Sequence, residues 1–385
     1  MTTKEKVKAI LIEAAGCADT ATALSGEKLA AECGVSRAAI WKAVNALRQE
    51  GLQIEGTPNG GYALCDADVF TPELFKRDLA KSFPEFSDCH TEVFKEIDST
   101  NTYAKRLLAE CGALRTFGGE LTEAGKRYHK AVIVAESQTA GRGRLGRTFL
   151  SPAKSGIYLS VIYAPEGGIQ NPARLTAATA VAICRAIRKL YGIETQIKWI
   201  NDIFYKGKKI SGILAEGVTN FESGMIESAI VGMGINIKDN PEVFSGDLAK
   251  VAGSICGREE SSSAPGNNVQ GGNVQGNSVQ GKCTQGESPK ENITRTALAA
   301  QIAGEVLNIY EEDLTNHQQI IEEYRSLSFL IGKSLTVHPL IGDDKSAYTA
   351  TAQSIDDDAR LVVKLPDGSI RTLNSGEVSL HSSEI

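Results

Sequence analysis

Residues 132–162 read VIVAESQTAGRGRLGRTFLSPAKSGIYLSVI, and this stretch decides the fold of the middle of the chain. Its ends, VIVAES and GIYLSVI, are apolar runs of strand length, and glycine and arginine fill the loop between them. Glycine lets a backbone approach a ligand closely, and arginine supplies a fixed positive charge. The loop residues are Gly141, Arg142, Gly143, Arg144, Gly146 and Arg147. We expect a phosphate or carboxylate to bind here; the alternative is a solvated basic loop that binds nothing.

The segments around this loop mix strand and helix patterns. Further strand-like apolar runs occur up to about residue 258, while 173–191 carries its apolar residues on one helical face. A second helical block spans 294–314 and is also apolar on one face. These patterns predict one domain of sheet and helix over 67–330.

Two polar clusters stand in apolar surroundings. The first is DSTN at 98–101, which opens a helical pattern and suits either helix caps or a ligand site. The second is IKWINDIFYKGKKISGILAEG at 197–217, where Lys198 and Asp202 follow one strand and Lys209 begins the next. Two lysines and an acid around one hairpin suit a metal-bound polyphosphate and an attacked phosphorus.

Residues 1–66 predict a winged helix-turn-helix. EKLAAECGVSRAAIWKAVNALRQEG, at 27–51, places small Ala30, Gly34 for a tight turn and apolar Ile40 at the spacing of that motif. The segment LQIEGTPNGGYAL that follows has the turn residues of a hairpin wing. We therefore expect two helices followed by a hairpin.

The second helix of this pair would offer a polar face to a DNA major groove. That face consists of Ser36, which would also cap the helix, Arg37, Lys42, Asn45 and Arg48. Residues 1–65 hold seven Lys and Arg against seven Asp and Glu, so the domain is not basic overall, and a helical pair for protein contacts is the alternative. Because few phosphate contacts give weak binding, we expect a dimer on palindromic operator DNA.

The last third of the chain contains two distinct segments. From Glu259 to Glu291, units such as VQGGN and VQGNS repeat in a stretch rich in Gly, Ser, Asn and Gln. This composition cannot build a core, so we expect 259–291 to be a flexible surface insertion rather than a binding or solenoid module. Over 331–385, five short strand-like runs separated by turn signals predict a small barrel.

Composition excludes several classes of protein. The 385 residues carry 41 Lys and Arg against 47 Asp and Glu, a net charge of −6, which argues against binding nucleic acid or membranes by bulk charge. No apolar run is long enough to span a bilayer, and the polar start lacks a secretory signal. Eight cysteines without a C-x-x-C pair indicate free thiols, so we expect a cytoplasmic protein with no membrane partner.

Taken together, the motifs resemble those of the bacterial biotin–protein ligases that double as the biotin operon repressor. DSTN, ESQTAGRGRLGR, KWIND, KKISGIL and GMGINI follow one another between a winged helix-turn-helix and a small barrel ending in GEVSL. The resemblance covers nearly the whole chain apart from the insertion and residues 115–130. It implies an α+β multidomain protein with a central mixed-sheet ligase domain of the class II synthetase-like type and a C-terminal SH3-like β-barrel.

The resemblance also implies what the protein does. Biotin and ATP, with Mg²⁺, would give biotinyl-5′-adenylate, and a lysine of the biotin carboxyl carrier protein of acetyl-CoA carboxylase would then take the biotinyl group. The same chain would repress biotin synthesis genes on operator DNA as a homodimer formed on ligand binding, with biotinyl-5′-AMP as corepressor. No resident metal is implied.

Matching motifs assign roles to individual residues. Arg144 and Lys209 would be catalytic, since fixed charges offset the repulsion between a carboxylate and a phosphate. The residues implied to hold biotin are Ser99, Thr100, Asn101, Gln138, Arg142, Gly143, Arg144 and Lys209. Those implied to contact ATP or the adenylate are Arg147, Lys198, Asn201, Asp202 and Asn236.

The sequence departs from the family pattern at three places. Ile200 replaces the proline usual in KWPND, so we expect this strand end to be less rigid. His381 follows GEVSL where arginine is common, and the insertion 259–291 is absent from the usual pattern.

Two other functions stay open on sequence grounds. One is a related ligase acting on lipoate or octanoate, against which the GRGRLGR loop and the DSTN cluster speak. The other is a transcription factor whose central domain only senses a small anion.

Overall fold

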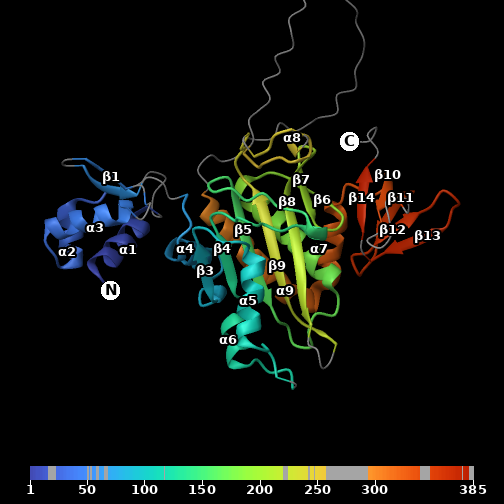
Figure 1. Ribbon diagram of the computed structural model, residues 1–385, viewed down its shortest axis with the longest axis horizontal. Helices are drawn as coiled ribbons and strands as arrows, with labels where there is room; N and C mark the ends of the chain where they lie inside the picture. The colour runs from blue at the N-terminus through green and yellow to red at the C-terminus, as the bar shows by residue number, and fades with distance from the viewer. Residues whose placement is uncertain are drawn as a thin grey trace, which may run out of the picture.

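The computed structural model describes most of the chain. The described residues are 1–15, 23–49, 52, 54–57, 60–64, 68–116, 118–219, 224–241, 243–246, 248–256, 294–338, 347–374 and 376–380. The expected insertion 259–291 and His381 lie outside them. Along the chain, a helical domain with a hairpin precedes a large mixed sheet with its helices and then a small β-sheet (Figure 1).

The first domain has the expected helix-turn-helix and hairpin, preceded by one more helix. Its elements are α1 (Thr3–Ala15), α2 (Gly26–Cys33), α3 (Arg37–Gln49), β1 (Ile54–Thr57) and β2 (Gly61–Leu64). Gly34 takes a φ of 68° between α2 and α3, and the Ser36 hydroxyl accepts a hydrogen bond from the Ala39 amide. The prediction of two helices was incomplete: α1 has a weak amphipathic pattern, yet its Val7 and Leu11 pack in the same core as Ile40.

Seven strands form the central sheet in the order β3-β4-β5-β9-β8-β7-β6. Their bounds are β3 (Thr91–Phe94), β4 (Val132–Ala135), β5 (Gly156–Tyr163), β6 (Gln196–Lys198), β7 (Asp202–Tyr205), β8 (Lys208–Thr219) and β9 (Ile226–Asn236). β3 and β4 pair in parallel and the other neighbours pair antiparallel, so the predicted mixed sheet is confirmed. The runs that flank the Gly-Arg loop are β4 and β5, which are adjacent antiparallel strands, so the loop begins and ends at one edge of the sheet.

Helices cover both faces of this sheet (Figure 1). α7 (Pro172–Tyr191) and α9 (Arg295–Leu327) pack on one face with Val132 and Val134, whereas α5 (Thr100–Cys111) packs on the other with Ile133. Because both faces are covered, β4 and β5 are buried along their whole length and appear as continuous apolar runs in the sequence. Shorter helices are α4 (Pro72–Ser82), α6 (Glu123–Tyr128) and α8 (Leu248–Val251).

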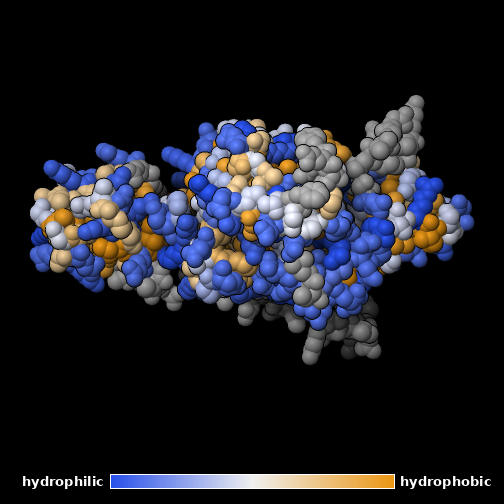
Figure 2. All heavy atoms as spheres, turned by 90° about the horizontal axis from the view of Figure 1, so that it is seen from below, coloured by the Kyte–Doolittle hydropathy of each residue, from blue (hydrophilic) through white to orange (hydrophobic). Residues whose placement is uncertain are grey.

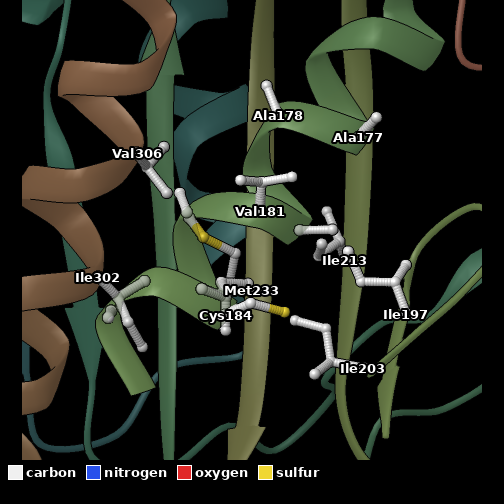
Figure 3. Close-up of a cluster of buried hydrophobic side chains, with 14 of the residues drawn as sticks. Ala177, Ala178, Val181, Cys184, Ile197, Ile203, Ile213, Met233, Ile302 and Val306 are labelled. Carbon is white, nitrogen blue, oxygen red and sulfur yellow. The ribbon is translucent and has the colours of Figure 1, made fainter. Parts of the chain in front are cut away.

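Both helical predictions hold, and the second is longer than expected. α7 matches the predicted 173–191 within one residue. In Figure 3 its Val181 and Cys184 lie with Met233 of the sheet in the buried core. α9 continues beyond residue 314 to Leu327, with a non-helical φ of −125° at Asn316, because buried Ile320 extends its apolar face.

The five predicted C-terminal strands are present. They are β10 (Ser334–His338), β11 (Tyr348–Ile355), β12 (Leu361–Lys364), β13 (Ile370–Leu373) and β14 (Glu377–Leu380), all antiparallel, in the order β13-β12-β11-β10-β14. This sheet packs on the central domain, where the Trp199 indole donates a hydrogen bond of 2.8 Å to the Ala359 carbonyl. Closure into an SH3-like barrel and the boundaries after residues 66 and 330 stay predictions.

Hydrophilic residues dominate the surface of the central domain on the face that Figure 2 shows. Within the described parts of the chain, no helix combines the length and apolar character needed to cross a bilayer.

Candidate active site

A cavity of about 320 Å³ lies where the start of α5, the Gly-Arg loop and strands β8 and β9 meet. Glu377 and Val378 of β14, in the C-terminal sheet, also line it. The residues predicted to hold biotin or ATP that line it are Ser99, Thr100, Asn101, Gln138, Arg142, Gly143, Arg144, Arg147, Lys198, Asn201, Asp202 and Lys209. Three sequence segments separated by dozens of residues therefore meet at one cavity.

The α5 end of the cavity is a network of buried polar side chains. Ser99 is the N-cap of α5, because its hydroxyl accepts a hydrogen bond from the Thr102 amide. Cap and site are compatible, since this cap places Thr100 and Asn101 at the cavity. The Thr100 amide donates to Gln138 Oε1 at 2.8 Å, and Gln138 Nε2 donates to Ser151 Oγ at 2.8 Å.

Glycines are required where side chains lie against the backbone of this site. A Cβ on Gly232 would meet Asn101 Oδ1 at 2.3 Å, and one on Gly234 would meet the Phe149 ring at 2.4 Å. A Cβ on Gly141 would meet the Phe149 carbonyl oxygen at 2.3 Å. The glycines of GMG in β9 and the first glycine of the loop therefore give the polar network and the aromatic ring their room.

Arginines and lysines line the other end of the cavity. Arg144 donates to Asn201 Oδ1 at 2.9 Å and to the Gly376 carbonyl at 3.1 Å. Arg147 pairs with Glu377 of β14 at 2.5 Å. These partners are oxygen acceptors, which phosphate oxygens can replace.

The two lysines of this end differ in their surroundings. Lys209 Nζ lies 2.6 Å from Asp202 Oδ1, so each neutralises the other. Burial lowers the pKa of Lys198, an effect that nearby Asp202 opposes and Lys209 reinforces. The structure thus gathers four cations beside two carboxylates, which suits an anion of several charges.

Asn236 and Ile200, which the sequence singled out, do not line the cavity. Asn236 ends β9 but does not line the cavity, because its Nδ2 donates to the Gly253 carbonyl at 3.0 Å. Ile200 is buried, its carbonyl accepts a hydrogen bond from the Tyr324 hydroxyl, and the Trp199–Ile200 peptide bond is cis. The structure therefore separates Asn236 from the other predicted adenylate residues.

Sequence reasoning assigned no role to Phe149, Ser160 or Glu216, which contribute to the site or its support. Ser160 donates a hydrogen bond to Asn101 Oδ1, and Glu216 accepts one from Asn101 Nδ2. A signal for Glu216 was present, because alternation along β8 puts it on the same face as the cavity residues Gly212 and Leu214.

The predicted DNA-contacting residues lie on or before α3. Arg37 and Lys42 are exposed, and Arg37 pairs with Glu27 at 3.3 Å. Arg48 donates from Nε to the Ile54 carbonyl in β1 and from Nη1 to Asn45 Oδ1, so it joins α3 to the hairpin. A role of these residues in DNA binding stays a prediction.

Three regions of the chain match models of known protein families. Residues 19–63 match an HTH domain, 119–236 the Biotin/lipoate A/B protein ligase family, and 339–381 the Biotin protein ligase C terminal domain. Over these three regions the chain is similar to biotin protein ligases.

Two similar proteins are named as bifunctional ligase/repressors. The Bifunctional ligase/repressor BirA of Bacillus subtilis is 33% identical over 232 residues, which cover 60% of this chain and 66% of that protein, just under two thirds of its length. The Escherichia coli BirA is 28% identical over 364 residues, covering 94% of each protein. A solved biotin protein ligase from Aquifex aeolicus, in complex with biotin and ATP, has a TM-score of 0.53 and 20% identity over 76% of this chain and 98% of that one, which establishes a common fold.

Proposed function

We propose that this protein activates biotin with ATP and transfers it to a lysine of the biotin carboxyl carrier protein of acetyl-CoA carboxylase. The observation that carries the proposal is the cavity itself, where a buried polar network lies beside Arg144, Arg147, Lys198 and Lys209. The matching ligase domain and the names of the relatives support the same reaction.

In the first step, the biotin carboxylate attacks the α-phosphorus of ATP, an O–P bond forms and pyrophosphate leaves. Arg144 and Lys209 would bind the oxygens on which charge develops, because a preorganised cation stabilises the transition state more than the ground state. Lys209 would exchange Asp202 for these oxygens, and Arg144 would exchange Asn201 and Gly376.

In the second step, the carrier lysine attacks the acyl carbon, an N–C bond forms and AMP leaves. The Gly-Arg loop would exclude water from the mixed anhydride, which would otherwise hydrolyse. No covalent nucleophile of this chain is required. Burial raises the pKa of the Cys184 thiol to about 12, so this residue is a poor nucleophile at neutral pH.

We also propose that the reaction uses Mg²⁺. Among the described residues, no group of three or more His, Cys, Asp or Glu side chains is arranged to hold a metal ion. Asp202 and Glu377 nevertheless line the cavity, and Mg²⁺ is commonly bound by one or two carboxylates together with substrate phosphates. Asp202 would hold the ion, which would neutralise phosphate charge.

The test is incubation of the purified protein with biotin, MgATP and a carrier domain, with release of pyrophosphate and the mass of the carrier as readouts. A carrier heavier by one biotinyl group is expected. Parallel reactions with lipoate and octanoate address the related ligases, and a carrier modified by either of these instead of biotin would refute the proposal. Tight biotin binding without any modified carrier would favour the sensor function.

We further infer that the chain represses biotin synthesis genes, with biotinyl-5′-AMP as corepressor. The HTH domain and the exposed Arg37 and Lys42 on α3 support binding to operator DNA. The adenylate would favour a homodimer, which presents two α3 helices at a fixed spacing. Both proposed partners, operator DNA and the carrier protein, imply a cytoplasmic protein.

Gel shifts and sedimentation test the regulatory part. Biotin and ATP together should tighten binding to a palindromic operator far more than either alone, and they should raise the dimer fraction. Arg37→Ala should weaken DNA binding and leave ligation unchanged, because Arg37 lies on α3, outside the cavity. Equal DNA affinity with and without both ligands would contradict control by the adenylate.

A further inference from the structure

A chain of hydrogen bonds runs beneath the α5 end of the cavity and ends on a carboxylate. Asn101 Nδ2 lies 2.9 Å from Glu216 Oε2, and Asn101 Oδ1 lies 2.6 Å from Ser160 Oγ. Ser160 Oγ is in turn 2.7 Å from Thr100 Oγ1. Thr100, Asn101 and Ser160 are at most 4% exposed, so water does not replace these bonds. Glu216 and Ser160 lie outside the cavity lining, whereas Thr100 and Asn101 belong to it.

The orientation of the Asn101 amide is fixed by its neighbours. Its nitrogen faces two acceptors, Glu216 Oε2 and the Leu214 carbonyl oxygen at 3.1 Å, so only the NH₂ group can occupy that side. Its oxygen therefore faces Ser160. An amide oxygen can only accept, so the contact of 2.6 Å requires the proton of the Ser160 hydroxyl.

The same reasoning fixes the direction of the next bond. A serine hydroxyl has one proton, and Asn101 takes it, so the 2.7 Å contact with Thr100 Oγ1 uses the proton of Thr100. Gln138 Oε1, which lies 3.2 Å from Thr100 Oγ1, is a second acceptor for that proton. The Thr100 amide already donates to Gln138 Oε1 at 2.8 Å, and the contact with Ser160 is the shorter of the two hydroxyl contacts, so the proton of Thr100 lies toward Ser160. The Thr100 hydroxyl then has lone pairs left and no proton for a ligand in the cavity.

Cations keep Glu216, the last residue of this series of hydrogen bonds, ionised. Lys105 of α5 lies 2.7 Å from Glu216 Oε1, and Arg142 of the Gly-Arg loop lies 3.5 Å from the same atom. Burial raises the pKa of Glu216, but the hydrogen bonds and charges of Lys105, Asn101 and Arg142 lower it by more, so that the net shift is downward. As an ionised carboxylate, Glu216 can only accept.

We propose that Glu216 is a positioning residue for the floor of the cavity, by which we mean Thr100 and Asn101 at its α5 end. Glu216 fixes which of their polar atoms donate and which accept, so that Thr100 accepts a hydrogen bond from an N–H group of the ligand. This inference rests on the proposed function, because the ureido ring of biotin supplies such N–H groups. Lipoate and octanoate have none at the corresponding end. The floor would therefore select biotin over these acids, because a buried acceptor without a donor partner is costly.

Glu216→Gln tests the polarity at nearly constant volume. A glutamine cannot offer acceptors to both Asn101 and Lys105, so one of these contacts becomes donor against donor. We expect calorimetry with biotin alone to give a Kd raised by roughly 10- to 100-fold. Wild-type protein should also bind an N,N′-dimethylated biotin far more weakly than biotin, and this preference should shrink in Glu216→Gln.

Glu227→Gln is the matched control, because Glu227 lies on the neighbouring strand β9 and accepts from the Leu114 and Arg115 amides outside the cavity. It should bind biotin as the wild type does. Wild-type affinity and wild-type preference in a folded Glu216→Gln protein would overturn the inference, even if the carrier is biotinylated. Failure of the wild type to modify a carrier would instead refute the proposed function.

Lys105→Met keeps the inference testable if Glu216→Gln does not fold. Loss of Lys105 raises the pKa of Glu216, and Arg142 is the other charged side chain that faces it. Glu216 then takes up a proton at a higher pH than in the wild type. A proton on Glu216 Oε2 would face the Asn101 Nδ2 donor and disturb the arrangement that leaves Thr100 as an acceptor. Biotin affinity of Lys105→Met should match the wild type at pH 8 and fall off at a higher pH on acidification. Superimposable pH profiles of the two proteins would overturn the inference.

Discussion

The two ends of the cavity are built in opposite ways. At the α5 end, Thr100 and Asn101 are 4% and 3% exposed, and their hydrogen bonds are made within the protein. At the cationic end, the Arg147 side chain is 67% exposed and pairs with Glu377 from the C-terminal sheet. The first end is therefore formed before a ligand arrives, whereas the second must exchange its own acceptors for phosphate.

This difference predicts that one end determines which ligand binds and that the other determines the rate of reaction. A preformed, buried site discriminates between ligands, because a ligand with the wrong hydrogen-bonding group leaves a buried partner unpaired. Cations act most strongly where charge develops, which is at the attacked phosphorus. Substitutions at the α5 end should therefore weaken biotin binding, and those at the cationic end should lower the rate.

The largest effect is expected for the cations closest to the proposed chemistry. Lys209→Ala and Arg144→Ala should each lower the rate of pyrophosphate release at saturating substrates by about 10² to 10³. Lys208→Ala is the matched control, because this neighbouring lysine of β8 does not line the cavity. A wild-type rate in either variant would remove that residue from the catalytic site and break the division of roles.

A methyl group at the α5 end should act on binding instead. In Gly232→Ala the new Cβ would lie 2.3 Å from Asn101 Oδ1, and forcing atoms into a packed site costs about 1–3 kcal/mol. Biotin affinity should fall roughly 5- to 150-fold, with the rate at saturating biotin changed much less. In the control, Gly217→Ala, the atoms nearest to the new Cβ belong to the side chain of Ile226 rather than to the polar network, so biotin affinity should stay at the wild-type level. Unchanged biotin affinity in Gly232→Ala would show that the α5 end is not rigid.

Local patterns were enough to predict much of the fold and of the cationic end. The Gly-Arg loop lies between two strands because VIVAES and GIYLSVI are continuous apolar runs, and such runs form strands covered on both faces. Arg144 and Lys209 reach one cavity because each follows or begins a strand of the same sheet. Roles implied by the family resemblance added the α5 cluster.

Contacts between distant segments could not be predicted in the same way. Glu216 meets Asn101 across 115 residues, and Glu377 meets Arg147 across 230, so both depend on strand register and domain packing. Asn236 shows the converse case, because its place in a motif did not reveal that its side chain donates a hydrogen bond to the Gly253 carbonyl, and its role at the adenylate stays a prediction. Motifs indicate which segments approach a ligand, and packing decides which side chains do.

Alkaline pH should affect the cationic end alone. Burial lowers the pKa of Lys198, so this lysine loses its proton at a lower pH than an ordinary lysine does. Adenylate formation should therefore decline on the alkaline side as Lys198 is deprotonated, while biotin binding measured without ATP stays flat. Lys198→Arg should extend the active range upward, because arginine keeps its charge. Parallel alkaline declines of binding and rate would contradict the separation of the two ends.

The smallest effect is expected where the C-terminal sheet meets the cavity. Arg147 and Glu377 form an exposed pair, and such pairs contribute about 0–1 kcal/mol. Glu377→Gln would release Arg147 to bind phosphate, so the KM for ATP should fall by less than about fivefold. The gain should shrink as ionic strength rises, because salt screens exposed charges. If the KM rises instead, Glu377 binds the substrate side directly, and the cationic end would then contain a built acidic element rather than a pairing that phosphate replaces.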